Sequence, residues 1–97
     1  SVNIWLDDER AMPDGFNTHV KTAEEAIELI KSGIVQKISL DHDLGTELTG
    51  LTVANFIEEQ AFHGKLKPIN CFVHSQNIVG AKNIKMALEN AKRFWEM

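Results

Sequence analysis

The sequence has little of what marks secreted or membrane-embedded proteins. It holds no tyrosine, two prolines and one cysteine, Cys71, among 97 residues. A lone cysteine cannot form a disulfide within the chain, which excludes a disulfide framework and indicates a reducing compartment. No apolar run approaches the ~18 residues that a membrane span needs. The first residues show neither the basic nor the apolar part of a secretory signal, so we expect a cytoplasmic protein without a membrane partner.

Positive charge is also scarce. The chain has 10 lysines and arginines against 14 aspartates and glutamates, which gives a formal net charge of −4. Attraction to an extended phosphate backbone needs several clustered cations, so a long duplex is excluded as a partner. A small nucleotide or the terminal phosphate of an RNA fits this charge better.

What is present is an alternation of short apolar runs and longer amphipathic segments, without repeats or linkers, which predicts one domain over residues 1–97. This alternation is typical of an α/β fold, here a mainly parallel sheet of about four strands with about three helices. Strands are expected at residues 3–6, 38–40 and 69–73 with a weak one at 19–21, and helices at about 22–31, 51–62 and 80–97.

The first two predicted strands lie unusually close in the sequence. About nine residues separate Glu9 from the weak second strand, fewer than a helical crossover between parallel strands needs, so the first crossover helix should be missing or reduced to a turn. One face of the sheet would then be thinly covered. We expect the C-terminal helix or a second copy of the chain to cover that face, and Trp5 and Trp95 to lie in the core.

Each of the three clear strands ends in polar side chains. In parallel sheets, ligands bind outside the carboxyl ends of the strands, so these side chains define a candidate site. The sets are Asp7, Asp8 and Glu9 after the first strand, Asp41, His42 and Asp43 after the next, and His74, Ser75 and Asn77 after the last.

So many carboxylates at one sheet edge would repel one another unless a cation neutralises them. Carboxylate oxygens suit Mg²⁺ or Mn²⁺, so we predict a divalent metal held by acidic side chains. The predicted ligands are Asp7, Asp8, Asp41 and Asp43. The alternative is that these residues are solvated loop starts and helix caps.

The other polar residues suggest phosphate chemistry. His42 and His74 have a side chain that titrates near neutral pH, and together they could divide general-base and general-acid work. Arg10, Ser75 and Asn77, with the amides that open the last helix, could hold phosphate oxygens. Simple helix capping is the alternative for Ser75 and Asn77.

These motifs resemble two related families. Asp7 and Asp8, Asp41 and Ser75 look like the phosphoacceptor site of response-regulator receiver domains, although the further strand with its lysine and the final helix of a receiver are missing. The motifs more closely resemble those of the cyclic-phosphate-processing receiver domains of bacteria and phages. They lie at residues 5–10, 39–45 and 74–77, and the resemblance spans residues 3 to about 88.

The resemblance implies a truncated receiver-like, or flavodoxin-like, fold and an activity on RNA 2′,3′-cyclic ends or cyclic nucleotides. It also implies that the acidic residues hold metal, that both histidines act on the phosphate, and that a phage-encoded copy would work in the host cytoplasm. The favoured hypothesis is a metal-dependent phosphoesterase with Asp41, His42 and His74 as catalytic residues.

Two alternatives stay open. Asp41 could be a covalent nucleophile with Asp43 as acid/base, a pattern similar to haloacid-dehalogenase phosphatases. Alternatively, the chain is a non-enzymatic receiver-like module that binds a nucleotide or a partner protein, or accepts phosphate on Asp41. A homodimer is compatible with each of these readings.

Overall fold

The structure is a computed structural model that describes residues 1–97. It contains four strands and three helices, and the strands form one parallel sheet in the order β2-β1-β3-β4. The strands are β1 (Val2–Leu6), β2 (Thr18–Val20), β3 (Val35–Leu40) and β4 (Asn70–Val73); the helices are α1 (Ala23–Lys31), α2 (Gly50–Phe62) and α3 (Ile78–Trp95). The predicted fold class, a truncated receiver-like α/β sheet, is confirmed.

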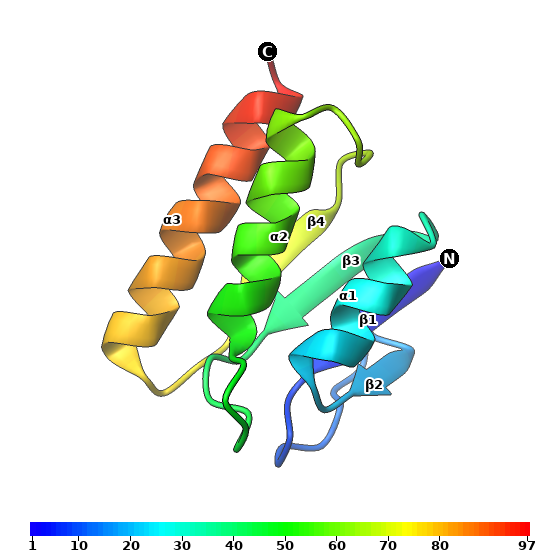
Figure 1. Cartoon of the computed structure of the whole chain (residues 1–97). Coiled ribbons are helices and arrows are strands. Elements are labelled where there is room, and N and C mark those ends of the chain that lie inside the picture. The colour runs from blue at the N-terminus through cyan, green and yellow to red at the C-terminus, as the bar shows by residue number, and fades with distance from the viewer.

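All three helices lie in one layer against one face of the sheet (Figure 1). The core between the layers contains Ile4 and Leu6 from β1 and Ile38 and Leu40 from β3, all fully buried. Helix α3 packs beside α2 and contributes Ile84 to this same core. The prediction that the C-terminal helix covers the second sheet face is therefore wrong. Its wide apolar stripe is buried against α2 instead.

The second face is covered by the segment between β1 and β2, which contains no helix, as the short spacing predicted. Trp5 lies on this face, outside the main core, and its ring contacts that of Phe16 with 5.4 Å between centroids. The Nζ atom of Lys37 lies 4.5 Å from the Phe16 ring. Phe72 on β4 remains 51% exposed, so this cover does not extend to the edge of the sheet.

The tryptophans differ from the prediction that both fill the core. Trp5 is buried but belongs to the second face, because it alternates with the core residues Ile4 and Leu6 along β1. Trp95 is partly buried against the core, and its Nε1–H donates to the carbonyl oxygen of Leu66 at 2.8 Å. Tryptophan often lies at the edge of a core, where its ring is buried and its N–H can reach a hydrogen-bond acceptor.

Side-chain caps set the starts of the helices. The Thr22 hydroxyl accepts from the backbone N–H of Glu25 at 3.2 Å and donates to the Glu25 carboxylate. Helix α3 begins at Ile78, earlier than the predicted Gly80, because the Asn77 side chain accepts from the Gly80 N–H at 2.8 Å. The N-terminus of α3 thus lies directly after the polar end of β4. No helix combines the length and apolar character that crossing a bilayer requires.

Candidate functional site

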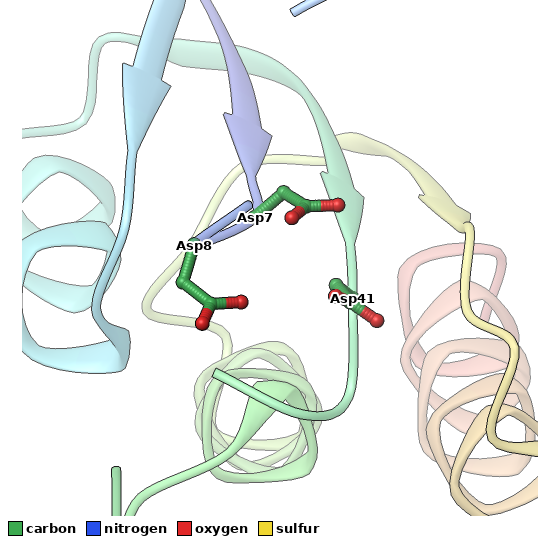
Figure 2. A group of neighbouring side chains, drawn as sticks. All are labelled: Asp7, Asp8 and Asp41. Carbon is green, nitrogen blue, oxygen red and sulfur yellow. The ribbon is translucent and has the colours of Figure 1, made fainter. Parts of the chain in front are cut away.

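Three carboxylates meet at the carboxyl ends of two neighbouring strands. Asp7 and Asp8 directly follow β1, and Asp41 directly follows β3. Leu6 and Leu40 are register partners, which brings the two strand ends level. Figure 2 shows Asp7 and Asp8 extending from the end of β1 toward the end of β3, where Asp41 lies. One oxygen from each carboxylate lies within 4.8 Å of the others.

This three-carboxylate group fits a hard divalent cation. Mg²⁺ binds oxygen at about 2.0–2.1 Å, so two of its ligands are at most about 4.2 Å apart. The three oxygens lie within 4.8 Å of one another, close to that limit. A bound cation would also relieve the mutual repulsion of the carboxylates.

Asp7 is the most constrained member of the group, at 1% exposed. Its Oδ1 accepts from the backbone N–H groups of Glu9 and Arg10, both at 2.8 Å, and its Oδ2 accepts from His74 Nε2–H at 3.1 Å. Burial raises the pKa of Asp7, but these hydrogen bonds outweigh it and hold the pKa below its ordinary value. The carboxylate is therefore ionised and held in one orientation.

The three carboxylates line a polar depression of about 320 Å³ with no hydrophobic residue in its wall. Every residue that the sequence predicted to bind metal or phosphate lines it, namely Asp7, Asp8, Asp41, Asp43, Arg10, Ser75 and Asn77. Neither predicted catalytic histidine does. A larger groove of about 700 Å³ runs beside β4 and α3 and contains none of the predicted site residues.

His42 lies beside the depression, among residues of its wall. Its Nδ1–H donates to Asp43 at 2.8 Å, and the Asn77 amide donates to both Asp43 oxygens at 3.3 Å. The hydrogen bonds from His42 and then Asn77 lower the pKa of Asp43. Asp43 is thus engaged by its neighbours, and the structure does not bring it into the three-carboxylate group.

His74 lies behind Asp7 and is enclosed. Its Nδ1 is 2.7 Å from Ser39 Oγ, its Nε2–H donates to Asp7, and its ring stacks on Trp5 with 3.6 Å between centroids. Burial lowers the pKa of His74, and the nearby carboxylates of Asp7 and Asp41 only partly oppose it. Because both ring nitrogens of His74 already have protein partners, His42 and His74 do not both offer a free nitrogen to one substrate atom.

The predicted phosphate-binding residues are held at the wall by local bonds. Asn77 caps α3, and Ser75 Oγ accepts from the Asn77 N–H at 3.1 Å, so capping is part of the role of both. The backbone of Arg10 donates to Asp7 and accepts from Trp5 Nε1–H at 3.2 Å. The exposed Arg10 guanidinium takes part in no ion pair, which leaves it available to an anion.

Sequence reasoning missed several residues that shape the site. Ser39 contacts His74 from the carboxyl-terminal part of β3. The available signal was a hydroxyl between two apolar residues, Ile38 and Leu40. Gly50 is also required, because a Cβ there would overlap the carbonyl oxygen of Asp41. Gly45, at φ +70, lets its loop approach Asp8, where a Cβ would lie 3.1 Å from the carboxylate.

Comparison with known proteins agrees with this geometry. The family model described as the cyclic-phosphate processing receiver domain matches residues 2–90. No curated protein and no solved structure gave a significant match. Receiver domains bind divalent metal through acidic residues at these strand ends, as the three-carboxylate group would. Since the match covers nearly the whole sequence, the chain belongs to the cyclic-phosphate-processing receiver family.

Proposed function

We propose that this protein is a metal-dependent phosphoesterase that opens a cyclic phosphate, either an RNA 2′,3′-cyclic end or a cyclic nucleotide. One observation carries the proposal: a single polar depression combines the three-carboxylate group with an unpaired arginine and the N-terminus of α3. Membership of the cyclic-phosphate-processing family supports the substrate class.

In this proposal Asp7, Asp8 and Asp41 hold Mg²⁺ or Mn²⁺. When bound, the ion supplies Lewis-acid stabilisation of phosphoryl charge and lowers the pKa of a bound water. The remaining chemistry belongs to side chains of the protein. Asp43, which was also predicted as a ligand, is assigned instead to the orientation of His42 because of the 2.8 Å hydrogen bond between them.

In this proposal other residues of the same depression hold the phosphate. Arg10 contributes its unpaired guanidinium, and Asn77 and Ser75 lie at the start of α3. A helix N-terminus carries a partial positive charge and unpaired N–H groups, which favour an anion there. Arg10 is the one basic side chain at the depression, and α3 supplies one helix N-terminus. The site therefore suits a single phosphate and not an extended nucleic-acid strand.

His42 is assigned the proton transfer. Its Nδ1–H is held by Asp43, so Nε2 carries the free lone pair. Nε2 has no protein partner, and no unpartnered side-chain nitrogen or oxygen is buried, so this atom reaches solvent. A carboxylate that orients a histidine whose other nitrogen is free is the arrangement of a general base.

The two alternatives from the sequence remain distinguishable from this proposal. Asp41 lines the same depression, so a covalent aspartyl phosphate with Asp43 as acid/base, or phosphate acceptance without turnover, would use the same residues. A binding module would hold the nucleotide without changing it. The homodimer, the cytoplasmic location and the bacterial or phage origin stay predictions.

The test is calorimetric titration of Mg²⁺ and Mn²⁺ into the wild type, Asp41→Asn and Glu9→Gln, followed by product analysis with a 2′,3′-cyclic nucleotide. Glu9 lines the depression but lies outside the three-carboxylate group, so Glu9→Gln is the matched control. We expect the wild type and Glu9→Gln to bind one ion and Asp41→Asn to bind at least about 10-fold more weakly. Only proteins that bind metal should release the ring-opened monophosphate.

The other outcomes point to the alternatives. Metal and nucleotide binding without any ring opening would support the binding module. Phosphate retained on Asp41, seen as an added mass on the intact protein, would support the covalent route. Failure of the wild type to bind either metal would overturn the phosphoesterase proposal.

A further inference from the structure

We propose that His74 is a positioning residue: its Nε2–H orients Asp7 for metal binding, and the Ser39 hydroxyl at Nδ1 supports the tautomer that makes this possible. This differs from a role in proton transfer to the substrate. The inference rests on the metal site of the proposed function.

Both ring nitrogens of His74 are already occupied. Nδ1 lies 2.7 Å from Ser39 Oγ, and Nε2 lies 3.1 Å from Asp7 Oδ2. Each ring nitrogen has one in-plane site for a hydrogen bond, so neither is left for a substrate atom.

The plane of the ring is fixed as well. His74 stacks on Trp5 with an interplanar angle of 7°. Trp5 is itself held by its hydrogen bond to the carbonyl oxygen of Arg10 and by contact with the Phe16 ring. Rotation of the imidazole would lose the stack and both hydrogen bonds together.

The hydrogen-bond partners determine which tautomer is present. An ionised carboxylate only accepts hydrogen bonds, so the proton of His74 lies on Nε2, facing Asp7. In the neutral ring Nδ1 then accepts from the Ser39 hydroxyl. Ser39 is 3% exposed, and a buried hydroxyl is costly without a partner. The pairing therefore also accounts for a serine within the buried strand β3.

The consequence for Asp7 is a single free coordination position. A carboxylate offers about four lone-pair sites. The amides of Glu9 and Arg10 use both sites on Oδ1, and His74 uses one on Oδ2. One site on Oδ2 remains, so Asp7 would bind a cation through that oxygen alone. Loss of such a supporting hydrogen bond typically weakens metal affinity 10- to 100-fold.

Two substitutions of His74 distinguish the effect of its hydrogen bond to Asp7 from the effect of losing the imidazole ring. The amide nitrogen of glutamine can replace Nε2, whereas that of asparagine can replace only Nδ1. We would titrate Mn²⁺ into the wild type, His74→Gln, His74→Asn and Ser39→Ala, and compare their unfolding without metal. We expect His74→Asn to weaken Mn²⁺ binding about 10- to 100-fold. His74→Gln should stay within a few-fold of the wild type, and Ser39→Ala should fall between them.

The tautomer gives a second measurement, independent of activity and of metal. Nitrogen-15 NMR of the wild-type imidazole should show a protonated Nε2 and an unprotonated Nδ1, and Ser39→Ala should weaken that preference. A folded His74→Asn protein that binds Mn²⁺ as tightly as the wild type would overturn the role of His74 alone. So would a folded His74→Gln protein that binds as weakly as His74→Asn. A wild type that binds no Mn²⁺ would instead overturn the metal site itself, and with it this role.

Discussion

At the scale of single residues, the two histidines at the strand ends show how neighbours decide a role. Both follow a core strand, and both contact an aspartate. His42 is fixed through one nitrogen and keeps the other free, whereas His74 is fixed through both nitrogens and through the face of its ring. The same side chain is therefore suited to proton transfer at one position and to orientation of a carboxylate at the other.

Cys71 provides a residue-scale prediction that is independent of the site. Burial raises the pKa of its thiol to about 12, well above the ordinary value for cysteine. The unfolded chain would lose this proton first as the pH rises, so stability is fully present below about pH 9 and declines above it by about 1.4 kcal/mol per pH unit.

The measurement is urea unfolding of the wild type and Cys71→Ala at pH 8, 9 and 10. Cys71→Ala serves as the reference because it keeps every other titrating group. The wild type should lose about 1.4 kcal/mol more than the variant between pH 8 and pH 10. Parallel curves for the two proteins would contradict the raised pKa.

At the scale of elements, each of the two helices beside the site has a glycine in its first turn for packing reasons. The backbone of Gly50 opens α2 against the carbonyl of Asp41, and its N–H donates to the carbonyl oxygen of His42 at 2.9 Å. Gly80, in the first turn of α3, lies against the His42 ring, where a Cβ would overlap the ring atoms. The absence of two side chains lets both helix ends close around Asp41 and His42.

Because of this contact, we predict that Gly80→Ala lowers the stability of the protein, which is the opposite of the usual effect of this substitution in a helix. In an unobstructed helix, alanine in place of glycine stabilises by about 1 kcal/mol. Here the added methyl group must displace His42, so we expect a loss of about 1–3 kcal/mol, as for other overpacked sites. Thermal unfolding would measure it, with Lys82→Ala, an exposed change in the same turn, as a near-neutral control. A more stable Gly80→Ala protein would show that α3 does not press on His42.

At the scale of the whole molecule, the site and the cover of the second sheet face belong to one segment. Residues 7–17 supply Asp7, Asp8 and Arg10 at the depression and Phe16 against Trp5. The Trp5 ring in turn stacks on His74, which is hydrogen-bonded to Asp7. The cover of the second sheet face and the three-carboxylate group are therefore linked through one series of contacts.

The linkage predicts that metal stabilises the entire fold. A ligand that binds only the native state adds about 2.7 kcal/mol at a concentration 100-fold above its dissociation constant. For a chain of this length that corresponds to a rise in melting temperature of roughly 10 °C. Calorimetric scans with increasing Mn²⁺ should show this rise for the wild type, and EDTA should reverse it. Asp41→Asn should show a smaller rise at each Mn²⁺ concentration because it binds the ion more weakly, and an equal rise in that variant would place the ion elsewhere.

The fold and the outline of the site were predictable because they depend on local patterns. Apolar periodicity marked the strands and helices, and the short spacing after Glu9 predicted the missing crossover helix. In a parallel sheet the strand ends meet at one edge, so Asp7, Asp8 and Asp41 could be grouped without coordinates. The side of the sheet taken by α3 was not predictable, since its apolar stripe fits either face.

What the sequence alone determined, then, is which residues end the strands, that the strands run parallel, and the family to which their motifs belong. Only the tertiary structure decided that His74 meets Asp7, 67 positions away, and Ser39, 35 positions away. The same holds for the place of Asp43 outside the three-carboxylate group. Periodicity is a property of neighbouring residues, whereas these contacts depend on strand order, register and the packing of rings such as Trp5, which exist only once the chain has folded.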